Sequence, residues 1–186
     1  MENLKEYIQS ITDLSEASWT ILKDCFTELS VNKGTYLLKE NEVCNAVYFI
    51  SSGYCKSFYN KEGKEINTAF YFERDFFTNI VSLKSGEKSK YSIKACEYSE
   101  VIKFDKLSLL DAYKKSREIE TFGRTILEII IKRQEEHIDT FKLLTPAQRY
   151  DNLLLKQPGI LQRVSLTQIS SYLGISRETL SRIRGK

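Results

Sequence analysis

The chain has 186 residues, 41% of them hydrophobic, which suffices for one well-packed core and a smaller second one and so predicts two domains. No apolar run approaches the roughly 20 residues of a membrane helix, and no signal peptide is recognisable, so we expect a cytoplasmic protein with no membrane partner. The net charge is +3, but eight basic and two acidic residues from Lys142 onward give this tail +6 and leave −3 for residues 1–141. A nucleic-acid partner would therefore meet the tail.

The first thirty residues have helical periodicity. Apolar residues recur at three- and four-residue spacing from Leu4 to Ile11, which predicts one helix. Ser15, or alternatively Thr12, can cap a second helical segment. The apolar positions of that segment are Trp19, Leu22, Cys25, Phe26 and Leu29.

From Gly34 to Phe104 the pattern changes to short runs rich in β-branched and aromatic residues, separated by glycine and polar turns. The expected strands cover residues 35–39, 46–51, 54–59, 66–72, 91–96 and 100–104. Turns at Ser52-Gly53 and at Asn60-Lys61-Glu62-Gly63 would close hairpins. Regular short strands of this kind predict a β-roll or jelly roll, and with the flanking helices the expected fold class is α+β.

Residues 118–144 predict one long helix whose apolar face is wider than a single neighbour requires. Part of that face can cover the β-roll while the rest meets a second copy of the chain, which predicts a homodimer. The alternative is a helix buried within its own domain. Thr145 as cap and Pro146 at the first position begin a further helix, which runs to about Lys156. We place the domain boundary near Leu144, giving domains 1–144 and 145–186.

Residues 165–184 predict two short helices joined by a tight turn. Ser165 and Gln168 can form a capping box, Gly174 can end the first helix in a left-handed residue, and Ser176 can cap the second. The outer face of the second helix would hold Arg177, Glu178, Ser181, Arg182 and Arg184. An arginine-rich face suits the major groove of DNA, because arginine binds guanine through two hydrogen bonds. The pattern predicts a helix-turn-helix; the alternative is two surface helices with solvated arginines.

The run L-G-I-S-R-E-T-L-S-R-I (173–183) resembles the recognition motif of the catabolite-activator/fumarate-nitrate-regulator (Crp/Fnr) family of bacterial transcription factors. The runs K-G-T-Y-L-L-K-E-N (33–41), V-Y-F-I-S-S-G (47–53) and D-F-F (75–77) resemble the cyclic-nucleotide-binding β-roll of that family. The resemblance implies an effector-modulated transcription regulator that binds palindromic double-stranded DNA as a homodimer, with RNA polymerase as a further partner. Because better-known members continue beyond this helix, we expect a short natural variant.

On DNA, the resemblance implies base reading by Arg177, Glu178 and Arg182. The phosphate contacts would come from Ser176, Thr179, Arg184 and Lys186. In the roll, the family's phosphate-binding cassette uses a glycine, a glutamate and an arginine, and an ungapped count places Thr78, Asn79 and Ser89 at these positions.

Loss of the guanidinium–phosphate pair alone should cost on the order of 2 to 3 kcal/mol or more. Lys88 and Lys90 flank Ser89 and could supply a cation to another anion, but lysine is a point charge and not a planar fork. We therefore expect a degenerate site at Thr78, Asn79, Ser89 and Lys90 that binds neither cyclic AMP nor cyclic GMP tightly. The effector is unidentified, and an apolar effector among the aromatic residues of the roll is an alternative.

Other functions find little support in the sequence. Its four cysteines match no C-x-x-C pattern, so we expect reduced, mostly buried thiols and no ligand set for an iron–sulfur cluster. A metal-dependent oxygenase would need two or three histidines, and the chain has only His137, which we interpret as structural or as a mild pH-sensitive contact, with haem ligation as an alternative. We expect no enzyme, no metal and no cofactor. The rival function is an effector- or protein-binding regulatory module that keeps the fold without binding DNA.

Overall fold

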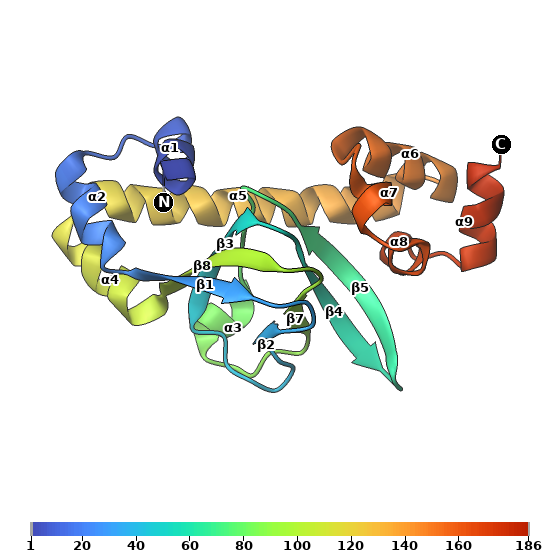
Figure 1. Cartoon of the computed structure of the whole chain (residues 1–186), viewed down its shortest axis with the longest axis horizontal. Helices are drawn as coiled ribbons and strands as arrows, with labels where there is room; N and C mark the ends of the chain where they lie inside the picture. Colours follow the sequence, from blue (N-terminus) through green and yellow to red (C-terminus); the bar gives the residue numbers. More distant parts are fainter. Residues whose placement is uncertain (1, 186) are drawn as a thin grey trace.

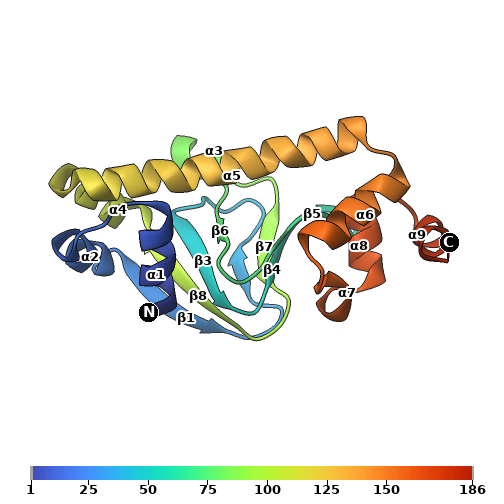
Figure 2. The same ribbon diagram turned by 90° about the horizontal axis from the view of Figure 1, so that it is seen from above.

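The computed structural model describes residues 2–185, in which the long helix α5 (Arg117–Leu143) runs along most of the molecule (Figure 1). Helices α1 (Glu2–Ile11) and α2 (Glu16–Lys23) pack near its N-terminal half (Figure 2). The strands are β1 (Phe26–Val31), β2 (Tyr36–Leu38), β3 (Ala46–Ser52), β4 (Cys55–Lys61), β5 (Lys64–Tyr71), β6 (Phe76–Phe77), β7 (Ser92–Ala95) and β8 (Ser99–Asp105). The remaining helices are α3 (Ile80–Ser85), α4 (Lys106–Lys115), α6 (Pro146–Lys156), α7 (Ile160–Arg163), α8 (Leu166–Leu173) and α9 (Arg177–Arg184). No helix within residues 2–185 is long and apolar enough to cross a membrane.

The strands form a roll of facing antiparallel sheets, one with the order β1-β8-β3-β6 and a second with the order β2-β7-β4-β5. Tyr48, Ile50 and Ile93 belong to the apolar core between the sheets. Val47 and Phe49 point to the opposite side of β3, where they join a second core with α1, α2, α4 and α5. Strand β3 is therefore buried on both faces, because successive side chains in a strand alternate. The predicted α+β architecture, with a β-roll and a long helix, is confirmed.

The predicted strands correspond to β2, β3, β4, β5, β7 and β8, but the second N-terminal helix is shorter than predicted. Ser15 caps α2 by accepting a hydrogen bond from the Ser18 amide, and α2 then ends at Lys23. The expectation that this helix extends through Phe26 and Leu29 is wrong, since Phe26–Val31 forms β1 and pairs with β8. Pairing between residues so far apart in sequence overrides the local periodicity. Strand β6, α3 and α7 are too short to show a period and lie outside the predicted elements.

The C-terminal helices have the start and stop signals that the sequence predicts. Thr145 and Ser165 each form a capping box with the glutamine three residues later, at the starts of α6 and α8. Gly174 has a φ of 66° at the end of α8, and the Ser176 hydroxyl accepts a hydrogen bond from the Thr179 amide at the start of α9. These signals involve neighbours in sequence, which is why they can be read without a structure.

The C-terminal helices share a core with the roll. Tyr54, Phe70 and Phe72 of the roll belong to one apolar cluster with residues of α6, α7, α8 and α9. The C-terminal members of this cluster are Tyr150, Leu153, Ile160, Val164, Ile169, Leu173 and Leu180. Contacts between α8 and β5 accompany this packing, so the C-terminal part is seated against the roll.

All four cysteines are free and buried, as the sequence predicts. Burial is the main cause that raises the pKa of Cys55 to about 12 and that of Cys96 to about 11. Burial also raises the pKa of Cys25. These thiols therefore stay protonated at neutral pH and behave as small apolar side chains, since only a thiolate is a good nucleophile or metal ligand.

Gly53 lies where both the backbone and the packing exclude a side chain. Its φ is +85°, and a Cβ at this position would stand 2.6 Å from the carbonyl oxygen of Tyr98. Gly63 has a similar φ of +79° but nothing within 4 Å of such a Cβ. We expect Gly53→Ala to lower the free energy of unfolding by roughly 2 to 4 kcal/mol and Gly63→Ala by about 1 kcal/mol. Urea unfolding monitored by circular dichroism would measure both, and equal losses would contradict the packing argument.

Candidate DNA-reading surface and effector sites

The outer face of α9 is fully available to a partner. Arg177, Glu178, Arg182 and Arg184 are exposed, and within residues 2–185 none of these arginines forms an ion pair. Arg182 donates a hydrogen bond only to the Thr179 hydroxyl on its own helix, at 3.3 Å. The three residues that the family resemblance assigns to base reading therefore lie together on one exposed face.

The residues assigned to phosphate contacts lie beside this face. Ser176 is exposed and its hydroxyl donates to the Thr179 hydroxyl at 3.1 Å, while Thr179 is half-buried. Arg184 is exposed in the last turn of α9, and Lys186 lies outside the described residues. The capped start of α9 leaves amide groups that favour a negative charge.

The inner face of α9 fixes the helix to α8. Leu180 is 1% exposed and packs in the same cluster as Ile169 and Leu173 of α8. The turn is closed by a hydrogen bond from the Ile175 amide to the Ser170 carbonyl, at 3.0 Å. A Cβ on Gly174 would stand 3.0 Å from the ring of Phe141, so glycine is required here by its left-handed backbone and also by the close approach of α5.

Polar contacts hold α8 against β5 of the roll. The Ser171 hydroxyl accepts from the Asn67 amide at 3.0 Å and donates to the Glu65 carbonyl at 3.1 Å. The Asn67 side chain also donates to the carbonyl of Gln168 at 3.3 Å. These three bonds join one turn of α8 to β5 of the roll.

A second polar contact joins α7 to the roll. Arg163 donates to both carboxylate oxygens of Glu73 at 2.8 Å and to Glu97 at 2.5 Å. The hydrogen bond from Arg163 is the main cause that lowers the pKa of Glu73. The Tyr54 hydroxyl donates to the Arg163 carbonyl at 3.0 Å. A two-pronged arginine–carboxylate pair fixes orientation better than a single contact does, so α7 has a defined seat.

Helix α5 presents an apolar stripe to solvent. Leu127, Ile131, Ile138 and Phe141 are between 38% and 50% exposed, and Gln134 lies between them. The alternating spacings of four and three residues place these positions on one side of the helix, which is the pattern of a coiled-coil seam. The residues that face the roll are distinct, since Ile119, Phe122, Ile126 and Ile130 are buried. The long helix thus has one covered face and one uncovered face.

A cavity of about 320 Å³ lies between the roll and α5. Of the four residues assigned to the effector pocket, Thr78 lines this cavity. Arg133 of α5 and the tyrosines Tyr59, Tyr71, Tyr91 and Tyr172 also line it. Sequence reasoning missed Arg133, although a signal was present: with Ile126 and Ile130 it follows the helical spacing of the buried face.

The other assigned effector residues bond within the protein. Asn79 caps α3 by accepting from the Ser82 amide at 3.1 Å, and its amide nitrogen donates to the Ser89 hydroxyl at 2.9 Å. The Ser89 hydroxyl in turn donates to the carbonyl of Tyr91 at 2.6 Å. Asn79 and Ser89 are buried and Lys90 is exposed. The Thr78 hydroxyl donates to the carbonyl of Ala46 in β3 at 2.7 Å, so Thr78, Asn79 and Ser89 all have hydrogen-bond partners within the protein.

His137 lies on α5 between two aromatic rings. Its ring centroid is 4.9 Å from that of Phe141 and 5.0 Å from that of Tyr172. Burial, followed by the charge of Arg133, lowers the pKa of His137 below its usual value, so the ring is neutral at physiological pH. Within residues 2–185 no group of three or more histidine, cysteine, aspartate or glutamate side chains could hold a metal ion.

Residues 28–116 match the family model of the cyclic nucleotide-binding domain. The matched range covers the two-sheet roll from within β1 to β8 together with α4, so the roll is similar to cyclic nucleotide-binding domains. No protein of curated function matches the sequence.

Solved structures with the same fold include several transcription regulators. FixK2 from Bradyrhizobium japonicum has a TM-score of 0.72 at 23% identity, covering 86% of this chain and 83% of its own. A protein assigned to the Crp/Fnr family of transcriptional regulators, from Eubacterium rectale, has a TM-score of 0.70 at 19% identity, covering 92% and 82%. A CooA variant from Carboxydothermus hydrogenoformans has a TM-score of 0.69 at 17% identity, covering 92% and 79%. The chain thus shares its fold with transcription regulators over most of its length.

Proposed function

We propose that this chain is a sequence-specific, DNA-binding regulator of transcription of the Crp/Fnr type. The observation that carries the proposal is the outer face of α9, where Arg177, Glu178 and Arg182 are exposed while Leu180 anchors the helix from behind. Arginine recognises guanine and glutamate accepts from cytosine in the major groove, so α8 and α9 form a helix-turn-helix with α9 as its recognition helix. The fold shared with transcription regulators supports the same role.

The regulator acts as a homodimer in this proposal. The exposed stripe of Leu127, Ile131, Ile138 and Phe141 would pack against the same stripe of a second copy. Two recognition helices would then read the two halves of a palindrome, which lie about 34 Å apart when they occupy successive major grooves. A change in the crossing of the paired helices would alter this spacing, and an effector could act in this way. RNA polymerase stays a predicted further partner.

Cyclic AMP and cyclic GMP are not the effectors in this proposal. A cyclic phosphate needs donors that are free to bind it, whereas Asn79 and Ser89 are buried and bond to one another. We expect isothermal titration calorimetry to detect no binding of either nucleotide with a dissociation constant below about 100 μM, which corresponds to a binding free energy of roughly 5 kcal/mol. An affinity in the micromolar range would contradict this expectation.

Selection of bound duplexes from a random pool tests the proposed function directly. Purified protein is incubated with the pool at fixed salt, bound DNA is sequenced over several rounds, and we expect enrichment of one site with twofold symmetry. Fixed salt is essential, because non-specific binding through phosphates depends steeply on ionic strength. A folded protein that enriches no sequence would contradict DNA reading and favour a regulatory module that binds other partners.

A further inference from the structure

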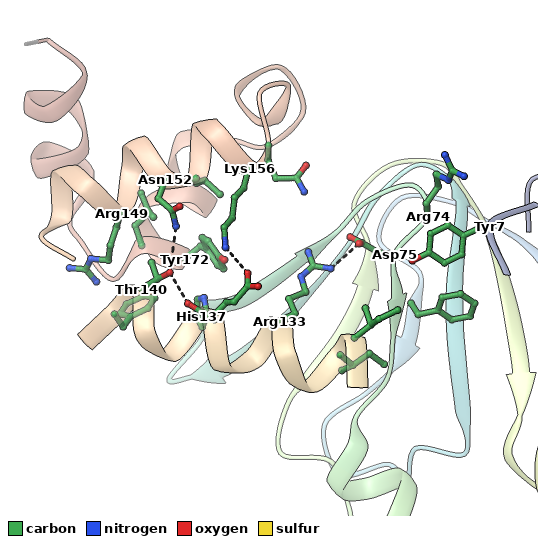
Figure 3. A pocket seen from close by; sticks show the side chains of 18 residues that line it. Tyr7, Arg74, Asp75, Arg133, His137, Thr140, Arg149, Asn152, Lys156 and Tyr172 are labelled. Carbon is green, nitrogen blue, oxygen red and sulfur yellow. Dashed lines mark hydrogen bonds and ion pairs between the residues drawn. The ribbon is translucent and has the colours of Figure 1, made fainter. Parts of the chain in front are cut away.

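A cleft of about 360 Å³ lies between the roll and the C-terminal helices (Figure 3). Its walls come from α5, from α6, from the turn between β5 and β6, and from Tyr7 of α1. It adjoins the cavity in the roll, with Arg133, His137 and Tyr172 lining both. Because α6 and Tyr172 belong to the C-terminal part, the shape of the cleft depends on how that part sits against α5 and the roll.

The cleft has more positive than negative charge. Its cationic side chains are Arg74, Arg133, Arg149 and Lys156, and its carboxylates are Asp75 and Glu136, an excess of two positive charges. Arg133 pairs with Asp75 at 2.9 Å and Lys156 pairs with Glu136 at 2.6 Å. Two guanidinium groups, those of Arg74 and Arg149, have no carboxylate partner within the part of the chain that the structure describes.

Arg74 and Arg149 lie toward opposite ends of the cleft (Figure 3). Each guanidinium stacks on an aromatic ring, Arg74 at 5.4 Å from the centroid of Tyr7 and Arg149 at 4.6 Å from that of Phe141. The Nε atom of Arg149 is buried and has no hydrogen-bond partner in the described residues. A buried donor of this kind is rare in a folded protein and indicates a missing acceptor.

The lining between the two arginines suits an organic molecule. Leu153 and Leu173 provide apolar surface, and the amide of Asn152 has only a long contact of 3.5 Å with the Thr140 hydroxyl. The neutral ring of His137 adds a further polar atom to this wall. An inorganic ion would leave the apolar surface uncovered, whereas a small carbon skeleton would cover it.

We propose that this cleft binds a small organic dianion at its Arg149 end, with an acidic group against the Arg149 guanidinium. The dianion would complement the excess of two charges and leave both existing ion pairs in place. A dicarboxylate and a phosphate monoester share this chemistry, and the experiment below distinguishes them. By bridging α5 and α6, the bound anion would fix the C-terminal helices relative to the roll. This regulatory consequence rests on the proposed function, whereas the binding itself does not.

Calorimetry and thermal unfolding of the full chain test the binding. The probes are adipate as the dicarboxylate and phenyl phosphate as the phosphate monoester, both at constant ionic strength, with benzamide as an uncharged control. We expect one of the two dianions to bind saturably at one site and to raise the unfolding temperature with increasing concentration. Arg149→Gln should weaken that binding about tenfold or more, because it removes a charge-assisted contact, whereas Arg74→Gln, at the opposite end of the cleft, should weaken it much less.

Arg124→Gln is the matched control, since Arg124 is an exposed arginine of α5 outside the cleft and its only described bond is to Thr121. It removes the same charge and should leave the affinity unchanged. The proposal is overturned if neither dianion binds with a dissociation constant below about 10 mM, a binding free energy of roughly 3 kcal/mol. It is also overturned if the Arg149, Arg74 and Arg124 variants all lose affinity equally. A general effect of charge would produce the second result.

Coupling to DNA forms a separate arm of the experiment. If the dianion changes the affinity for the selected duplex, the duplex must change the affinity for the dianion by the same factor. We expect a change of at least about fivefold, which is lost in Arg149→Gln. Binding of the dianion without any effect on DNA would retain the site and overturn only its regulatory role. Failure of DNA binding altogether would instead overturn the proposed function and leave the dianion titration intact.

Discussion

Arg177→Ala and Arg182→Ala are each expected to lower the affinity for the selected duplex by roughly 5- to 150-fold, the value of one two-pronged contact with guanine. Both side chains are exposed and form no ion pair within residues 2–185, so their removal should leave the fold intact. Fluorescence anisotropy with a labelled duplex, at one fixed salt concentration, measures the affinity. The same titration with base substitutions in the half-site measures sequence preference.

The pattern of the loss matters more than its size. Removal of a base-reading arginine should abolish the sequence preference at one or two positions of the half-site. Removal of an arginine that contacts only phosphate should weaken binding to all sequences and reduce the dependence of binding on salt. Arg124→Ala removes the same charge on the distant part of α5 and should change neither quantity. If both α9 variants keep the full sequence preference, α9 is not the recognition helix.

Ile138→Lys is expected to convert the proposed dimer into a monomer. Ile138 is 50% exposed on the single chain, so lysine should be tolerated there by the isolated fold. In the dimer, two lysines would face each other in an apolar seam, and unpaired buried charges of this kind weaken association by at least about 100-fold. Sedimentation velocity measures the state of association. A monomer can contact only one half-site, so the variant should also lose tight binding of the palindrome.

Asp139→Asn provides the control for the change in net charge, because it removes one negative charge at the neighbouring position and so also raises the net charge by one, and it lies outside the apolar stripe. It should leave both association and DNA binding unchanged. A wild-type protein that is monomeric at all concentrations, or an Ile138→Lys variant that remains a dimer, would contradict the seam on α5.

Local signals predict much of this molecule. The caps of α2, α6, α8 and α9 depend on residues within three positions of one another, and the long helix and most strands show their own periods. The β1 strand was not predictable in this way, because its pairing partner lies about seventy residues later in β8. Arg163 shows the same limit, since its partners Glu73 and Glu97 are 90 and 66 residues away.

The candidate sites show the same difference between local signals and contacts of residues that are distant in sequence. The face of α9 could be predicted because a helix places residues three and four apart side by side. The network of Asn79 and Ser89 and the cleft with Arg74 and Arg149 bring together separate elements, and composition alone does not indicate such an arrangement. Arg133 is the exception, because an arginine in an otherwise apolar helical stripe is visible in the sequence.

Phe141 lies at the end of the exposed stripe of α5 and also touches the turn before α9. Its ring is 4.6 Å from the guanidinium carbon of Arg149, and a Cβ on Gly174 would stand 3.0 Å from it. One aromatic ring therefore belongs to the proposed dimer surface and to the pivot of the proposed recognition helix. In the proposed dimer, rotation of one α5 helix about its twin would press the Phe141 ring against Gly174 at the start of the turn. The movement would then be transmitted to α9 without passing through the roll.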